Sequence, residues 1–183
     1  MDVTEFRKKQ HKEVMDFRSA LTKETDRGCA LFAVAYLDKA LSDLLFCAFA
    51  YDKKIETDLF GGTAPLANFS SRIKLAFYLG KISKAERRDL DILRKIRNDF
   101  AHKAEQIDFE TPQISNRCGE LYFSYHEKTH RARGHFTAAC LGLLSSIHAE
   151  TLKCQAPEIK EDTSLTELKE KQRTFVKSLM END

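Results

Sequence analysis

Hydrophobic side chains recur at helical spacing over most of the chain, and few residues interrupt the pattern. Between residues 29 and 51 they surround almost the whole circumference of a helix, which predicts a centrally buried element. Residues 3–24 carry only a narrow apolar stripe, typical of a peripheral helix. A last core helix is expected over residues 136–152, before Pro157. The pattern therefore predicts an all-α fold, a compact antiparallel helical bundle.

Polar residues mark where the middle helices begin and end. Asn68 or Ser70 can cap a helix that ends at Gly80, because glycine suits the left-handed position after a helix. Ser83 and Glu86 form an S-x-x-E capping box, which predicts the start of the next helix. Glycine and proline predict a loop over residues 53–66, and another loop is expected over 108–112. The stretch 113–134 is mixed and predicts no element.

The 183 residues suffice for one sizeable core but not for two domains. We expect a helical bundle domain over residues 1–156 and a tail over 157–183. A second capping box at residues 164–167 precedes spaced apolar residues in that tail. It predicts a C-terminal amphipathic helix that docks on the bundle or on a partner subunit.

Composition restricts the classes of function. Thirty basic and 28 acidic side chains give a net charge of +2, so nucleic-acid binding would need a local patch. None of the five cysteines forms a C-x-x-C pair, and we expect all five to be buried and reduced. The first ten residues are charged, and no apolar run reaches the roughly 20 residues of a membrane span. These features predict a cytoplasmic protein with no membrane partner, metal or cofactor.

The segment from Arg97 to His102 carries the most suggestive chemistry. At 100° per residue, Arg94, Asn98 and His102 share one stripe of their helix, while Phe100 lies roughly opposite and faces the core. Arg97 lies one residue round from that stripe. Arg97 and His102 can point into one cleft only if the helix frays or bends near its end.

An arginine and a histidine in one cleft suit metal-free RNA cleavage by attack of a ribose 2′-hydroxyl on the adjacent phosphate. His102 would transfer the proton, Arg97 would stabilise the phosphate charge, and Asn98 would bind the phosphate or orient the imidazole. The structural alternative is that Arg97 pairs with Asp99 or with a neighbouring helix and that His102 caps the helix end. In that case the segment catalyses nothing.

The region from about residue 26 to 118 resembles the mannitol operon repressor (MtlR/MltR) family. The stretches that carry the resemblance, in order, are Asp26-Arg27-Gly28-Cys29-Ala30-Leu31, Tyr36-Leu37-Asp38, Gly61-Gly62, Pro65-Leu66, Phe69-Ser70-Ser71-Arg72-Ile73-Lys74-Leu75-Ala76 and Leu93-Arg94-Lys95-Ile96-Arg97-Asn98-Asp99-Phe100-Ala101-His102. The last stretch also resembles the R-x(4-6)-H signature of the HEPN superfamily, whose members include metal-independent endoribonucleases and inactive scaffold proteins.

The resemblance implies a helical bundle that forms a homodimer about the motif helix, with Arg97 and His102 of both subunits in one cleft. It makes the chain a candidate metal-independent endoribonuclease with catalytic residues Arg97, His102 and Asn98. The alternative function is a non-catalytic transcriptional regulator that acts through a protein partner. Direct DNA binding is not expected, because the sequence has no helix-turn-helix with a basic recognition helix and no basic arm.

The segment 122–135 is the strongest local basic and aromatic patch. Tyr125, Arg131 and Arg133 could stack bases and bind phosphates as an RNA track, or the segment could be an ordinary helix end whose aromatic rings enter the core. His126 and His130 are four residues apart, but no third ligand lies at a recognised spacing, so no metal site is predicted.

Acidic side chains on the otherwise apolar helix at 29–51 have two interpretations. Asp38 and Asp43, with Ser42 between them, form either an exposed strip or part of the cleft. A carboxylate near His102 would orient its imidazole ring.

Overall fold

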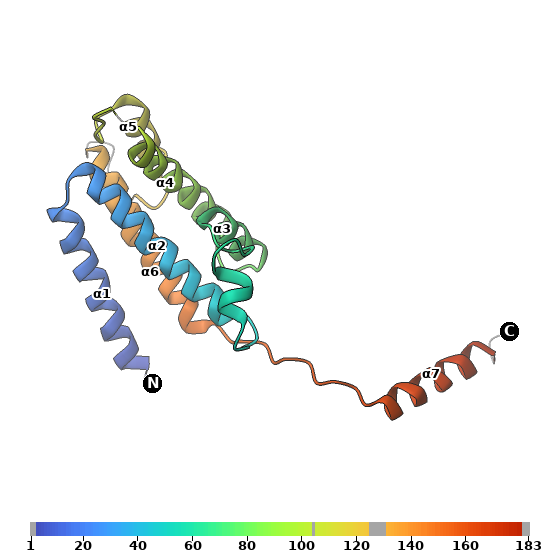
Figure 1. Ribbon diagram of the computed structural model, residues 1–183. Coiled ribbons are helices and arrows are strands. Elements are labelled where there is room, and N and C mark those ends of the chain that lie inside the picture. Colours follow the sequence, from blue (N-terminus) through green and yellow to red (C-terminus); the bar gives the residue numbers. More distant parts are fainter. Residues whose placement is uncertain (1–2, 104, 125–130, 181–183) are drawn as a thin grey trace.

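The computed structural model describes residues 3–103, 105–124 and 131–180 (Figure 1). Every regular element in these ranges is a helix, so the predicted all-α class is confirmed. The elements in chain order are α1 (Val3–Lys23), α2 (Asp26–Ala48), the π-helix η1 (Glu56–Phe60), α3 (Phe69–Tyr78), α4 (Lys84–His102), α5 (Pro112–Gly119), α6 (Ala132–Lys153) and α7 (Leu165–Met180).

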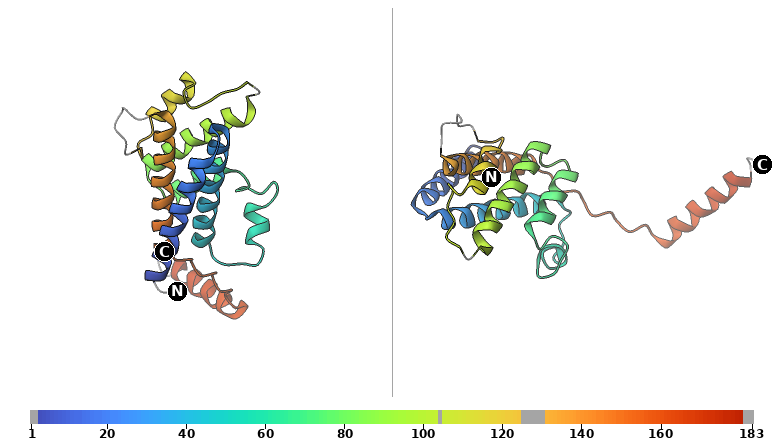
Figure 2. Two further views of the ribbon diagram at one scale, coloured as in Figure 1. Left: turned by 90° about the vertical axis from the view of Figure 1, so that its left-hand side faces the viewer. Right: turned by 90° about the horizontal axis from the view of Figure 1, so that it is seen from above.

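Helix α2 is the centre of the bundle. It packs against α1, α3, α4 and α6, and it lies beside α6 along most of its length (Figures 1 and 2). Leu37, Leu41 and Leu44 are fully buried there, as the nearly all-round apolar pattern predicts. One stripe of the helix stays in contact with solvent, since Phe32 and Phe46 remain partly exposed.

The predicted boundaries of α3 and α4 are confirmed. The Asn68 side chain accepts a hydrogen bond from the Ser71 backbone N–H at 2.9 Å. Gly80 adopts φ of +68°, the left-handed conformation that favours glycine. At the start of α4, the Ser83 hydroxyl accepts from the Glu86 N–H at 3.2 Å, and the Glu86 carboxylate accepts from the Ser83 N–H at 2.6 Å.

Two segments contain helices that the sequence pattern did not predict. The expected loop at 53–66 contains η1, whose end is held by the Gly61 N–H bonded to the carbonyl of Glu56 at 2.9 Å. Most of α5 lies in the unassigned stretch, and the helix begins just before it, at Pro112. Proline suits the first turn of a helix, because backbone N–H groups there have no intrahelical partner. Both helices are too short for a strong periodic pattern.

Helix α7 forms at the second capping box, with the Glu167 N–H bonded to the Ser164 hydroxyl at 3.3 Å. Residues 154–164 lead away from the bundle without helical structure, and α7 contacts no other helix of the described ranges (Figures 1 and 2). The predicted docking of this helix on its own bundle is therefore absent. No helix in the described part is long and apolar enough to cross a membrane.

The cysteines are free thiols, but they do not share one environment. Cys29, Cys118 and Cys140 are buried as expected. Cys47 and Cys154 are only half-buried, and the Cys47 thiol lies 3.8 Å from the carbonyl oxygen of Cys154. The expectation that all five would be buried is wrong for this pair, because it lies where α2 and α6 both end.

Candidate functional site

Helix α4 positions the segment that sequence analysis singled out. Ile96 and Phe100 are fully buried, and the Phe100 ring centre lies 5.2 Å from that of Phe109. The helix continues to His102, and Lys103 is the first residue with extended backbone. The core contacts therefore fix the helix up to its last turn.

The three predicted catalytic residues lie on two sides of α4. Arg97 and Asn98 are half-buried and His102 is exposed, and none of them has a polar partner among the described residues. Arg97 and His102 are five residues apart on a regular helix, so they point about 140° apart. The bend that would bring them together does not occur before His102. One chain alone therefore does not form the composite Arg/His cleft.

The acidic residues near the motif are engaged elsewhere. Asp99 forms an ion pair with Arg117 of α5 and not with Arg97. Asp91 pairs with Arg94 at 3.5 Å, not with Lys95 as spacing alone suggests. The Asp99–Arg117 pair ties α4 to α5, whereas the Asp91–Arg94 pair lies within α4. The Arg97 guanidinium is left unpaired within the described ranges.

The acidic strip of α2 does not contribute to the motif. Asp38 pairs with Arg72 of α3, and Asp43 pairs with Lys39 one turn earlier on α2. Because α2 and α4 run antiparallel, His102 lies near the beginning of α2 and not near these carboxylates (Figure 1). Of the two interpretations of this strip, the one that makes it part of a cleft beside His102 is therefore not supported.

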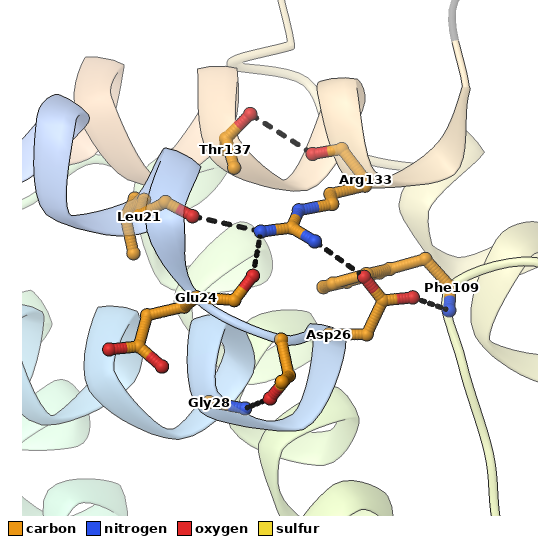
Figure 3. A network of polar contacts seen from close by, with 8 residues as sticks. Leu21, Glu24, Asp26, Gly28, Phe109, Arg133 and Thr137 are labelled. Atoms are coloured by element: carbon orange, nitrogen blue, oxygen red, sulfur yellow. Dashed lines mark hydrogen bonds and ion pairs between the residues drawn. The ribbon is translucent and has the colours of Figure 1, made fainter.

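Arg133 of α6 is the centre of a polar network at one end of the bundle (Figure 3). Its guanidinium donates to the carbonyls of Leu21 at 2.9 Å and Glu24 at 2.6 Å, and to the Asp26 carboxylate at 2.7 Å. The second oxygen of Asp26 accepts from the Phe109 N–H at 3.1 Å. Arg133 thus joins α1, α2 and α6, and its three contacts compete with any phosphate.

The residues beside Asp26 continue this junction toward the end of α4. Arg27 donates to the carbonyls of Lys103 at 3.0 Å and Glu105 at 3.3 Å. A Cβ atom on Gly28 would lie 2.2 Å from a carboxylate oxygen of Glu24, so glycine permits this close approach. The Asp26-Arg27-Gly28 stretch therefore holds the segment that follows α4 against the start of α2.

The basic and aromatic segment is only partly described. Tyr125, His126 and His130 lie outside the described residues. Arg131 is exposed immediately before α6 and has no polar side-chain partner among the described residues, whereas Arg133 holds the network above. Of the predicted RNA track, only Arg131 is both described and available.

Two buried carboxylates on α4 have structural roles that the charge pattern did not reveal. Asp89 is fully buried and accepts the backbone N–H groups of Tyr122 at 3.1 Å and Phe123 at 2.8 Å. Glu86 accepts a further hydrogen bond from the Ser146 hydroxyl of α6. In the sequence Asp89 resembles an ordinary exposed acid of a charged helix, and the capping box predicted for Glu86 gives no sign of its contact with α6. Both contacts come from segments that are distant in the sequence.

The sequence model of the mannitol repressor family (MtlR) matches residues 19–181. The chain therefore belongs to this family. The match extends through α7, well beyond the region in which sequence analysis found a resemblance.

Individual relatives agree with this assignment. The mannitol operon repressors of Escherichia coli strain K12 and of strain O6:H1 (CFT073) are each 30% identical over 103 residues, or 54% of this chain. The aligned part spans about half of each relative, 53% of its length. The X-ray structure of the MtlR-HPr complex from Escherichia coli has a similar fold, with a TM-score of 0.61 and 23% identity, over 73% of this chain and 99% of that chain.

Proposed function

We propose that this chain is a regulator that acts by binding a protein partner and has no catalytic activity. The observation that carries the proposal is its membership of the mannitol repressor family, together with a fold like that of an MtlR solved in complex with HPr. The proposed partner is HPr or a protein like it. Control of transcription would then follow from that complex and not from direct contact with DNA.

The geometry of α4 supports protein binding over catalysis. Proton transfer and phosphate stabilisation require both side chains within about 3 Å of one reacting group. Arg97 and His102 point to different sides of a regular helix, which does not meet that requirement in one chain. A protein partner does not need all its contacts at one reacting point. It can face Asn98 and His102, which lie about 40° apart, while the long side chain of Arg97 reaches the edge of the contact.

We assign the partner-binding surface to Arg97, Asn98 and His102. Arginine is enriched among the residues that dominate protein interfaces, and a half-buried guanidinium without an internal partner is available for one. The surrounding packing of Ile96 and Phe100 holds the helix rigid, so binding does not require the site to rearrange.

Calorimetric titration of the purified chain with HPr from Escherichia coli tests this proposal. We expect binding that Arg97→Ala weakens about 5- to 30-fold, the loss typical of truncating an interface arginine. Lys74→Ala is the control, because Lys74 is an exposed cation of α3, outside the proposed surface, with no polar partner in the described ranges. Absence of any interaction between wild type and HPr would refute the proposal.

RNA cleavage is the competing hypothesis, and the observation in its favour is that Arg97, Asn98 and His102 have no internal polar partners. It requires a homodimer, with Arg97 of one subunit near His102 of the other. Incubation of the wild type with mixed cellular RNA in excess chelator tests it. Cleavage that His102→Ala and Arg97→Ala both abolish, without loss of folding, would replace the regulator proposal with the nuclease.

A further inference from the structure

Helix α7 has an apolar stripe that no described residue of the bundle covers. Its large apolar side chains are all 46–76% exposed and recur on one side of the helix, at Leu165, Leu168, Phe175, Val176, Leu179 and Met180. A lone helix of this length is marginally stable in water, because propagation barely repays the cost of nucleation. The stripe therefore needs a surface to pack against.

The charges of α7 restrict what that surface can be. At 100° per residue, Lys169 and Arg173 lie along one edge of the stripe and Lys171 along the other, while Glu167 and Glu170 lie on the back. Cations on both edges favour an apolar surface with carboxylates at its rim. They disfavour pairing of α7 with a second α7, which would bring lysines together.

The same charges argue against the groove between α1 and α6. This groove has a volume of about 570 Å³ and is lined by apolar and small side chains such as Leu21, Leu141 and Gly142. Among the described residues that line it, Arg18 is the only ionisable one, and it would meet the cationic edges of α7 as a like charge.

An aromatic patch at the end of α2 has the required character. Phe46 is 39% exposed, and its ring centre lies 6.0 Å from that of the half-buried Phe60 of η1. Phe49 packs on the same ring at 6.3 Å. Glu56 and Asp58, in the first turn of η1, are exposed and have no ion-pair partner among the described residues. We call Phe46, Phe49, Phe60, Glu56 and Asp58 the α2–η1 patch.

We propose that α7 of one copy docks on the α2–η1 patch of a second copy. Residues 154–164 carry α7 away from its own bundle, and this connection reaches about 36 Å when extended (Figures 1 and 2). The exchange is reciprocal, so a two-fold dimer forms with two identical contacts. Phe175 packs against the phenylalanine rings, and Lys169 and Lys171 face Glu56 and Asp58.

Sedimentation velocity of the full chain at micromolar concentration tests the docking. The wild type is expected to be a dimer, and Phe175→Glu is expected to raise its dissociation constant roughly 30-fold or more, as for loss of a buried anchor. Glu170→Lys, on the back of α7, is the control and leaves the dimer intact. Because α7 contacts no other described helix, neither change should shift the thermal transition of an isolated monomer.

A charge exchange tests the partner surface directly. The double variant Lys169→Glu and Lys171→Glu, and the double variant Glu56→Lys and Asp58→Lys, should each be monomeric because like charges then meet in both contacts. An equimolar mixture of the two should dimerise again, since both contacts of the mixed dimer regain opposite charges.

Three results would overturn the proposal. If the wild type stays monomeric at 100 times the tested concentration, α7 does not dock on a second copy. A dimer that survives Phe175→Glu places the interface elsewhere, as on α4. Co-sedimentation of a monomeric chain with phosphatidylglycerol vesicles, lost in Phe175→Glu, would assign the stripe to a lipid surface.

Discussion

Asp89 gives the sharpest test of how this bundle is held together. Its carboxylate is fully buried in α4 and accepts the backbone N–H groups of Tyr122 and Phe123, at 3.1 Å and 2.8 Å. These two groups lie between α5 and α6, in the stretch 120–124, where the structure shows no helix. Asp89→Ala would leave both donors without this acceptor and open a small void.

The expected loss follows from the cost of an unsatisfied buried donor, about 1–3 kcal/mol each. Two such donors give about 2–6 kcal/mol, and relief from burying a charge reduces this to about 2–4 kcal/mol. For a chain of this length the transition temperature should fall by roughly 5–15 °C. Asp89→Asn keeps one acceptor oxygen and should lose about half as much.

Urea unfolding followed by circular dichroism at 222 nm measures the difference. Asp91→Ala is the matched control, because Asp91 lies two residues along the same helix and, among the described residues, pairs with Arg94 alone, near the surface. It should change the free energy of unfolding by less than about 0.5 kcal/mol. A loss below about 1 kcal/mol for Asp89→Ala, with an unchanged denaturant slope, would refute the structural role of this carboxylate.

Further predictions concern a turn, the polar network and the thiols. Gly80→Ala should cost about 1 kcal/mol in urea unfolding because φ is +68°, whereas Gly119→Ala, without a positive φ, should cost less. Arg133→Met should cost about 2 kcal/mol by the same assay, since three hydrogen bonds are lost from a partly exposed site. Burial raises the pKa of the Cys29 thiol from 9.0 to about 11 and that of Cys118 to about 12, so iodoacetamide should label neither in the folded protein at pH 8. These folded-state pKa values are higher than the thiol pKa of 9.0 in the unfolded chain, so the stability that the two thiols contribute should be complete below pH 9 and should decline as the pH rises toward 11 and 12. Free energies of unfolding measured at pH 8 and pH 10 would reveal the decline.

Local signals in the sequence determined the class of fold and most element boundaries. The all-round apolar helix at α2, the Asn68 cap, the Ser83 capping box and the glycine at position 80 each act within a few residues. Such signals are readable because backbone geometry and side-chain spacing set them before any tertiary contact forms. Spacing along one helix also identified the segment from Arg97 to His102.

Tertiary structure decided which polar residues hold the bundle together and which remain available. Arg133 looks like a phosphate ligand until the carbonyls of Leu21 and Glu24 are brought beside it. Asp89 looks exposed until a distant loop turns two N–H groups toward it. Sequence spacing gives the angles between side chains around one helix. It gives no local sign of a hydrogen-bond partner on another element, and the partners of Asp89 and Arg133 lie 33 to 112 residues away along the chain. Arg97 and His102 stay apart because α4 remains a regular helix up to His102, with Ile96 and Phe100 buried in the core.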